Sequence, residues 1–162
     1  VDPGIIESLY RASMAGVKID LTVRGMCSLR PGVAGVSDRI TVRSVVGRYL
    51  EHSRIYRFEN GGTPEVWLSS ADWMERNLDR RVELLFPVEN PKLRARIEDI
   101  LDLYAQDTEK ARYLHEDGEY RKRTARRGTA VQAQDHFMRL AADAAEKARQ
   151  PGTALFAVKA PT

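Results

Sequence analysis

Five short strand-like segments lie between two helical segments, and this order of elements limits the fold more than any other feature. Residues 3–15 place apolar side chains at helical spacing behind Asp2 and Pro3, which together are typical of a helix start. The strand-like segments are apolar or alternate apolar with polar residues, and they are residues 18–23, 40–45, 54–58, 65–68 and 82–88. Up to residue 89 the sequence therefore predicts an α/β fold.

The connections between these segments carry turn and cap residues. Residues 25–38 hold three glycines and a proline and are predicted to form a long loop, and residues 47–52 a short helix or a turn. Asn60, Gly61 and Gly62 predict a turn between two strands. Ser69 or Ser70 is expected to cap a helix through residues 72–78.

The second half of the chain is predicted to be a helical and hairpin extension of this core. Asn90 and Pro91 open a long amphipathic helix, and Asp117 with Gly118 marks the turn of a hairpin. A last helix is expected over roughly residues 129–149. A chain of 162 residues suits one domain, here residues 1–162 with an α/β core over 1–89 and the extension over 90–162.

Several classes of protein do not fit the composition. The 162 residues contain no run of eighteen apolar residues, and residues 1–10 are not a basic segment followed by an apolar one, so neither a membrane span nor a secretory signal is expected. The single cysteine, Cys27, excludes a cysteine-based zinc cluster and fits a reducing cytoplasm.

The basic residues are mostly arginine, with 20 Arg against 6 Lys at a net charge of +3. The planar guanidinium group matches phosphate oxygens in bidentate fashion. Residues 18–57 hold eight basic side chains against three acidic ones, and the basic ones are Lys18, Arg24, Arg30, Arg39, Arg43, Arg48, Arg54 and Arg57. This segment suits an anionic partner, and a solvated surface is the alternative.

His52 and Arg54 are two residues apart in the stretch LEHSRIYRFENGG, so on an extended chain they point to the same face. An imidazole beside a guanidinium suits a phosphate site, where the histidine acts as nucleophile or acid/base and the arginine stabilises developing charge. A structural histidine at a strand start is the alternative. Asn60 and Asp72 are candidates for orienting the histidine or a metal-bound water, although Asp72 is expected rather to cap the following helix.

The spacing H-x-R-x-x-x-x-E, followed by Ser69-Ser70-Ala71-Asp72, resembles the H-x-K-x-x-x-x-D and G-S-x-N motifs of the phospholipase D superfamily, with three conservative departures. Longer strings are more specific: VRGMCSLRPG, YLEHSRI and SSADWMERNLDRR resemble the C-terminal region of the long, histidine-autophosphorylating bacterial polyphosphate kinases. The resemblance is dense over residues 1 to about 115 and looser beyond.

This resemblance implies a phospholipase D-like mixed sheet flanked by helices and a kinase that moves the terminal phosphoryl group of ATP reversibly to polyphosphate with Mg²⁺. It places the phosphorylated histidine in an upstream domain, before Val1. It matches the ATP-contacting positions to Arg24 and His52, with His52 as the catalytic second-motif histidine. Arg30, Arg39, Arg43 and Arg54 are then candidates for lining a polyanion channel.

The resemblance also implies partners and a location. They are ATP or ADP, inorganic polyphosphate, the upstream domains of the same enzyme and further copies of it in a homo-oligomer. The location is the cytoplasm, at the membrane surface or away from it. No metal ligand is expected within this chain.

Two other functions stay open from the residues. One is a phospholipase D-like phosphodiesterase or nuclease that pairs two copies of His52 across a dimer. The other is a non-catalytic module that binds polyphosphate or nucleic acid.

Overall fold

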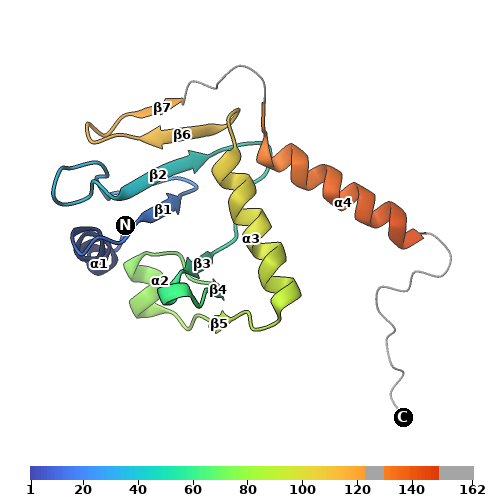
Figure 1. Cartoon of the computed structure of the whole chain (residues 1–162), viewed down its shortest axis with the longest axis horizontal. Coiled ribbons are helices and arrows are strands. Elements are labelled where there is room, and N and C mark those ends of the chain that lie inside the picture. The colour runs from blue at the N-terminus through green and yellow to red at the C-terminus, as the bar shows by residue number, and fades with distance from the viewer. Residues whose placement is uncertain (123–129, 150–162) are drawn as a thin grey trace, which may run out of the picture.

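The computed structural model describes residues 1–122 and 130–149, and Figure 1 shows how their elements are arranged. In chain order these are α1 (Pro3–Met14), β1 (Ile19–Thr22), β2 (Ile40–Val45), β3 (Ile55–Phe58), a 3-10 turn (Asn60–Gly62), β4 (Glu65–Ser69), α2 (Glu75–Arg80), β5 (Leu85–Pro87), α3 (Pro91–Gln106), β6 (Ala111–Leu114), β7 (Tyr120–Lys122) and α4 (Ala133–Arg149). The predicted α/β class is confirmed. Among these residues, none of the helices combines the length and apolar character needed to cross a bilayer.

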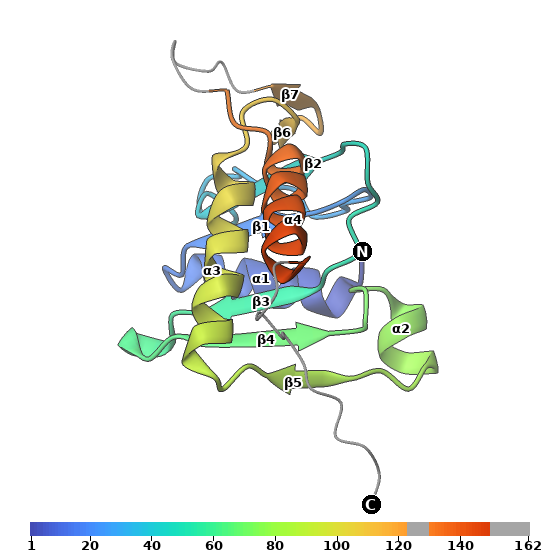
Figure 2. The same ribbon diagram turned by 90° about the vertical axis from the view of Figure 1, so that its right-hand side faces the viewer.

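The strands divide between two sheets. The first is mixed and has the order β1-β2-β6-β7, in which β1 and β2 run parallel, with Ile19 opposite Ile40, and the other pairs are antiparallel. The second has the order β3-β4-β5 and is antiparallel throughout. Helix α1 lies between the two sheets (Figures 1 and 2), and the segment from Val46 to Arg54 connects one sheet to the other.

The hairpin of β6 and β7 is an integral part of the first sheet. Strand β6 pairs with the last four residues of β2, from Val42 opposite Leu114 to Val45 opposite Ala111. The hairpin that was predicted as an extension therefore forms two of the four strands of the first sheet. The end of helix α3 meets the start of α4, and the two helices diverge from there (Figure 1); the rings of Tyr104 and Phe137 lie 5.2 Å apart between centroids at this contact.

The main core lies between α1 and the first sheet. Leu29, Ile40 and Val42 are buried there, and apolar side chains of α1 pack against them. Leu29 comes from the long irregular segment between β1 and β2, so this predicted loop contributes to the core. Ser37 is fully buried and fixes the loop, because its hydroxyl donates to the Arg30 carbonyl at 2.6 Å and accepts from the Val33 amide at 3.0 Å.

Some predicted elements differ in the structure. Residues 47–52 form no helix, and α2 begins only at Glu75, with Met74 at a cap position that has no side-chain hydrogen bond. The predicted serine cap is therefore wrong. The strand expected over residues 82–88 shortens to β5, which lies at a sheet edge with its side chains exposed. The last helix starts at Ala133 rather than near residue 129, which lies outside the described residues.

Candidate functional site

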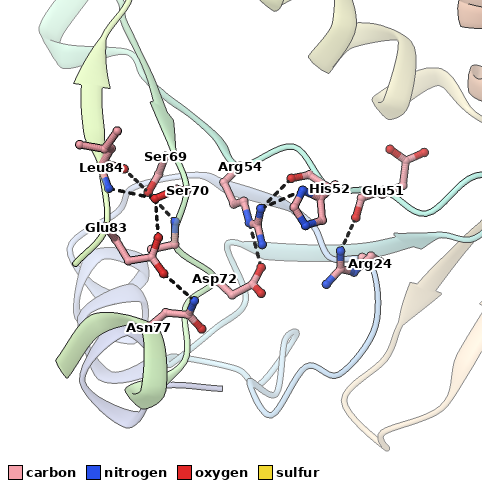
Figure 3. A network of polar contacts seen from close by, with 11 residues as sticks. Arg24, Glu51, His52, Arg54, Ser69, Ser70, Asp72, Asn77, Glu83 and Leu84 are labelled. Carbon is pink, nitrogen blue, oxygen red and sulfur yellow. Dashed lines mark hydrogen bonds and ion pairs between the residues drawn. The ribbon is translucent and has the colours of Figure 1, made fainter. Parts of the chain in front are cut away.

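His52 lies on the irregular segment that joins the two sheets, and its side chain is exposed. Arg54 is the residue just before β3, and its Nη1 lies 3.2 Å from His52 Nδ1 and donates to the His52 carbonyl at 3.0 Å (Figure 3). The predicted proximity of the two side chains is confirmed. Because a guanidinium can only donate, it faces a His52 Nδ1 that carries a lone pair, which leaves the proton of the neutral ring on Nε2.

Asp72 holds this arginine from the other side. Its Oδ1 accepts from Arg54 Nε at 3.0 Å, and both side chains are largely buried, 28% and 16% exposed respectively. The hydrogen bond from Arg54 holds the pKa of Asp72 below its usual value, and the charges of Arg54 and Arg24 act in the same direction. Asp72 thus orients Arg54 instead of capping α2, and the predicted cap role is wrong.

Loss of this ion pair is expected to destabilise the chain in a pH-dependent way. Asp72→Ala leaves a largely buried guanidinium without its carboxylate, so we expect the free energy of unfolding to fall by about 1–3 kcal/mol near neutral pH. The pKa of Asp72 is lowered in the folded chain, so its contribution is present above the unfolded value and is lost as the pH falls through the folded value. Denaturant titration measures both effects.

The matched control for this prediction is Asp79→Ala, which removes an exposed aspartate of α2. It should change stability by less than about 0.5 kcal/mol. The difference between wild type and Asp72→Ala should narrow as the pH is lowered. A difference that is absent at neutral pH, or that does not narrow in acid, would contradict the role of the pair.

Arg24 follows β1 and reaches the same segment from the first sheet. Its Nη1 donates to the carbonyl of Glu51 at 2.6 Å. This carbonyl belongs to the peptide group that joins Glu51 to His52, so the Arg24 side chain lies next to the backbone of His52, a residue 28 positions later in the sequence. Within the described part of the chain, Arg24 Nε and Nη2 and Arg54 Nη2 make no hydrogen bond. Donors therefore remain on both arginines for an anionic ligand beside His52.

Glu51, next to His52, was not among the predicted site residues. Its carboxylate accepts from Gln134 Nε2 at 2.6 Å and from the Tyr104 hydroxyl, and Figure 3 shows it directed away from His52. Burial and the neighbouring Glu51 raise the pKa of Tyr104, which keeps its hydroxyl a donor at neutral pH. No local sequence signal marks these partners, because Glu51 is 53 residues from Tyr104 and 83 from Gln134.

Ser69, the last residue of β4, and Ser70, which follows it, tie that strand to the residues before β5. The Ser69 hydroxyl donates to the Leu84 carbonyl at 2.9 Å, and Ser70 Oγ accepts from the Leu84 amide at 2.9 Å and donates to Glu83. Glu83 also accepts from Asn77 at 2.9 Å. Hydrogen bonds from Ser70 and Asn77 lower the pKa of the Glu83 carboxyl. These contacts fix the chain around Asp72 (Figure 3).

Other predicted residues lie outside this group. Arg43 is buried and pairs with Asp20 at 3.1 Å, so its predicted role in a polyanion channel is wrong. Arg30 donates from Nε to the Glu116 carbonyl in the β6–β7 turn, and its lining role stays a prediction. Asn60 bonds Glu65 at 2.9 Å in the turn after β3, so it does not orient His52.

The residues that the structure describes do not provide a metal site. No group of three or more His, Cys, Asp or Glu side chains is placed there to hold an ion. Asp72, the one carboxylate beside His52 that was considered for a metal-bound water, is already paired with Arg54.

Comparisons with known proteins agree on one family. The family model described as polyphosphate kinase C-terminal domain 2 matches residues 1–134. A polyphosphate kinase of Pseudomonas aeruginosa is 60% identical over 121 residues, which are 75% of this chain and 18% of that protein. One of Xylella fastidiosa is 58% identical over 122 residues, with 75% and 18% covered.

A solved structure is similar over most of the fold. The crystal structure of polyphosphate kinase from Porphyromonas gingivalis matches with a TM-score of 0.83 and 44% identity, over 90% of this chain and 22% of that one. The chain thus spans only 18% to 22% of the length of these relatives.

Proposed function

Because this chain belongs to the polyphosphate kinase C-terminal domain 2 family, we propose that it supplies part of the active site of an ATP:polyphosphate phosphotransferase. The enzyme would transfer the terminal phosphoryl group of ATP to polyphosphate, reversibly, through a phosphohistidine on an upstream domain. The observation that carries this proposal is the meeting of Arg24 with the peptide unit beside His52, with donors of Arg24 and Arg54 left for phosphate oxygens.

The proposed roles follow from the chemistry of the side chains. Arg24 and Arg54 bind phosphoryl oxygens and stabilise the charge that develops on them during transfer. His52, with its Nε2 directed away from Arg54, binds a phosphoryl oxygen or exchanges a proton with it. Asp72 and Glu51 hold the arginines in place without contacting the substrate.

Mg²⁺ is part of the proposal as an ion that arrives with ATP. Magnesium is usually bound by one or two carboxylates together with substrate phosphates, where it neutralises phosphate charge. The described residues offer it no cluster of their own. Each role assigned to this chain is therefore one of binding, orientation or proton exchange.

The proposal includes partners beyond the substrates. Leu84, Leu85 and Phe86 are exposed apolar side chains at and beside the edge strand β5, and such surfaces are suited to contact with other protein. We propose that the upstream domains of the same enzyme and other copies of it, as a homo-oligomer, are these partners. A cytoplasmic enzyme has direct access to ATP, and a peripheral membrane position is compatible with the same site.

The isolated chain of 162 residues is expected to make no polyphosphate from ATP and Mg²⁺. The phosphohistidine that the reaction requires would be supplied by another domain. The measurement is the formation of long polyphosphate, resolved by gel electrophoresis. The positive control is a chimaera in which this chain replaces the matching C-terminal segment of the Pseudomonas aeruginosa relative.

Three outcomes would contradict the proposal. Long polyphosphate made by the isolated chain would show that no second domain is needed. Release of alcohol or nucleotide from a phosphodiester by a dimer of the isolated chain would favour the phosphodiesterase alternative. Salt-dependent binding of polyphosphate that needs the arginines but not His52 would instead favour the non-catalytic module.

A further inference from the structure

We propose that Glu51 is a positioning residue, held by Tyr104 of α3 and Gln134 of α4, that places Arg24 for phosphoryl transfer. This inference rests on the proposed function, because Glu51 would act only through Arg24. It gives helices α3 and α4 a role in the site, although neither supplies a side chain that faces His52.

The first step is that Arg24 depends on one peptide group. Its only hydrogen bond within the described residues runs from Nη1 to the Glu51 carbonyl at 2.6 Å. The position of that carbonyl therefore decides where the remaining donors of the guanidinium point. A displacement of about 1 Å is enough to lower a transfer rate by about a hundredfold when positioning provides the catalysis.

The second step is that side chains hold this peptide group. In residues 1–122 and 130–149 no backbone-to-backbone hydrogen bond involves residues 46–53. The side chain of Gln134 supplies hydrogen bonds to this segment instead. Its Oε1 accepts from the Tyr49 amide at 3.0 Å, and its Nε2 donates to the Tyr49 carbonyl at 2.8 Å and to Glu51 Oε1 at 2.6 Å. One buried amide thus fixes both ends of residues 49–51.

Gly47 leaves room for this amide. A Cβ atom at Gly47 would lie 2.3 Å from Gln134 Oε1 and 2.8 Å from its Cδ, closer than real contacts allow. The backbone of Gly47 is outside the left-handed region, so alanine would be excluded by contact with Gln134 alone. Because Gln134 is only 4% exposed, it could move aside only by giving up its hydrogen bonds.

The third step is the second contact of Glu51. Its Oε2 accepts from the Tyr104 hydroxyl, and the Tyr104 ring packs against Phe137 of α4. The carboxylate is thus anchored to both helices at once, by donors that carry no charge. The side chain of Glu51 is held by the two helices, and its main-chain carbonyl accepts from Arg24. A carboxylate that faced solvent would not fix the position of this carbonyl.

A double-mutant cycle in the active chimaera tests the positioning role. Tyr104→Phe removes one hydroxyl and keeps the ring, and we expect kcat to fall about tenfold with KM changed less than about twofold. In the Arg24→Ala background the same change should alter kcat by less than about twofold, because its effect passes through Arg24. Tyr113→Phe is the matched control, since the described residues offer its hydroxyl no hydrogen bond.

Gly47→Ala supplies a second variant of the same mechanism. We expect it to lower kcat as Gln134→Ala does, and the double variant should be no slower than Gln134→Ala alone. Thermal unfolding of every variant separates this effect from a loss of folded protein. Full rescue of the Gly47→Ala defect by Gln134→Ala at equal stability would show that the defect is only a steric clash and that the hydrogen bonds of Gln134 are not needed for transfer, and it would overturn the positioning role.

The results separate this inference from the proposed function. If Arg24→Ala slows transfer while Tyr104→Phe behaves like Tyr113→Phe, the proposed function stands and the positioning role is overturned. Equal effects of Tyr104→Phe with and without Arg24 would also overturn it, because they indicate general destabilisation. If Arg24→Ala leaves turnover unchanged, both ideas fail.

Discussion

Replacing His52 with alanine in the active chimaera is expected to lower phosphoryl transfer by at least about a hundredfold, the contribution typical of a positioned acid/base. The imidazole lies between the two arginines that bind phosphate in the proposed site, and Arg54 fixes its orientation through Nδ1. Alanine removes both the phosphate contact and the proton-exchanging nitrogen. Steady-state rates of polyphosphate formation, with ATP saturating, measure the effect on kcat.

His115→Ala is the control for this prediction. His115 is an exposed histidine in the turn between β6 and β7, away from the segment that joins the sheets. Its replacement should leave the rate within about twofold. Near-wild-type turnover in His52→Ala would remove His52 from the site. Equal losses in both variants would show that histidine replacement acts by destabilising the chain.

The elements with strong local signals could be predicted from the sequence. Asp2 caps α1 as expected, since its Oδ1 accepts from the Ile5 amide at 2.9 Å, and Asn90 caps α3 in the same way. The proximity of His52 and Arg54 also follows from local geometry, because two residues on extended chain share a face. These features depend on residues that are neighbours in sequence.

The role of Asp72 shows why other features could not be predicted. An aspartate ahead of a helical pattern is a normal cap, and nothing local distinguishes it from one that is not. Asp72 instead pairs with Arg54, a residue 18 positions earlier that directly precedes strand β3. The energetic preference for satisfying a largely buried guanidinium outweighs that for one more hydrogen bond at a helix end.

Two arginines with similar local sequence, Arg24 and Arg43, differ in burial and in the partners of their guanidinium groups. Arg24 and Arg43 each come at or near the end of a strand in the first sheet, and both were candidates for anion binding. Arg43 is buried on a central strand, where Asp20 and the ring of Tyr113 occupy its guanidinium. Arg24 comes after the edge strand β1 and keeps free donors. Strand order, which depends on pairing with β6, decides the difference.

Arg24→Ala in the active chimaera is expected to lower kcat by at least about a hundredfold, as removal of a charge-stabilising group from a transfer site does. The more informative variant is Arg24→Lys, because it keeps the positive charge. In the wild type one nitrogen of the guanidinium is committed to the Glu51 carbonyl and the others remain for phosphate. A single ammonium group presents no such fork, so it cannot hold both partners in the same geometry.

We therefore expect Arg24→Lys to recover only a small part of the lost rate, and to leave a stronger dependence of the rate on salt than the wild type has. If lysine restored full turnover, Arg24 would act as charge alone. The contact with Glu51 would then be irrelevant to transfer. If Arg24→Lys were as slow as Arg24→Ala at every ionic strength, the positive charge at this position would contribute nothing to the rate, and the geometry of the guanidinium would account for the whole effect. An intermediate rate ties the chemistry of Arg24 to the peptide that holds it.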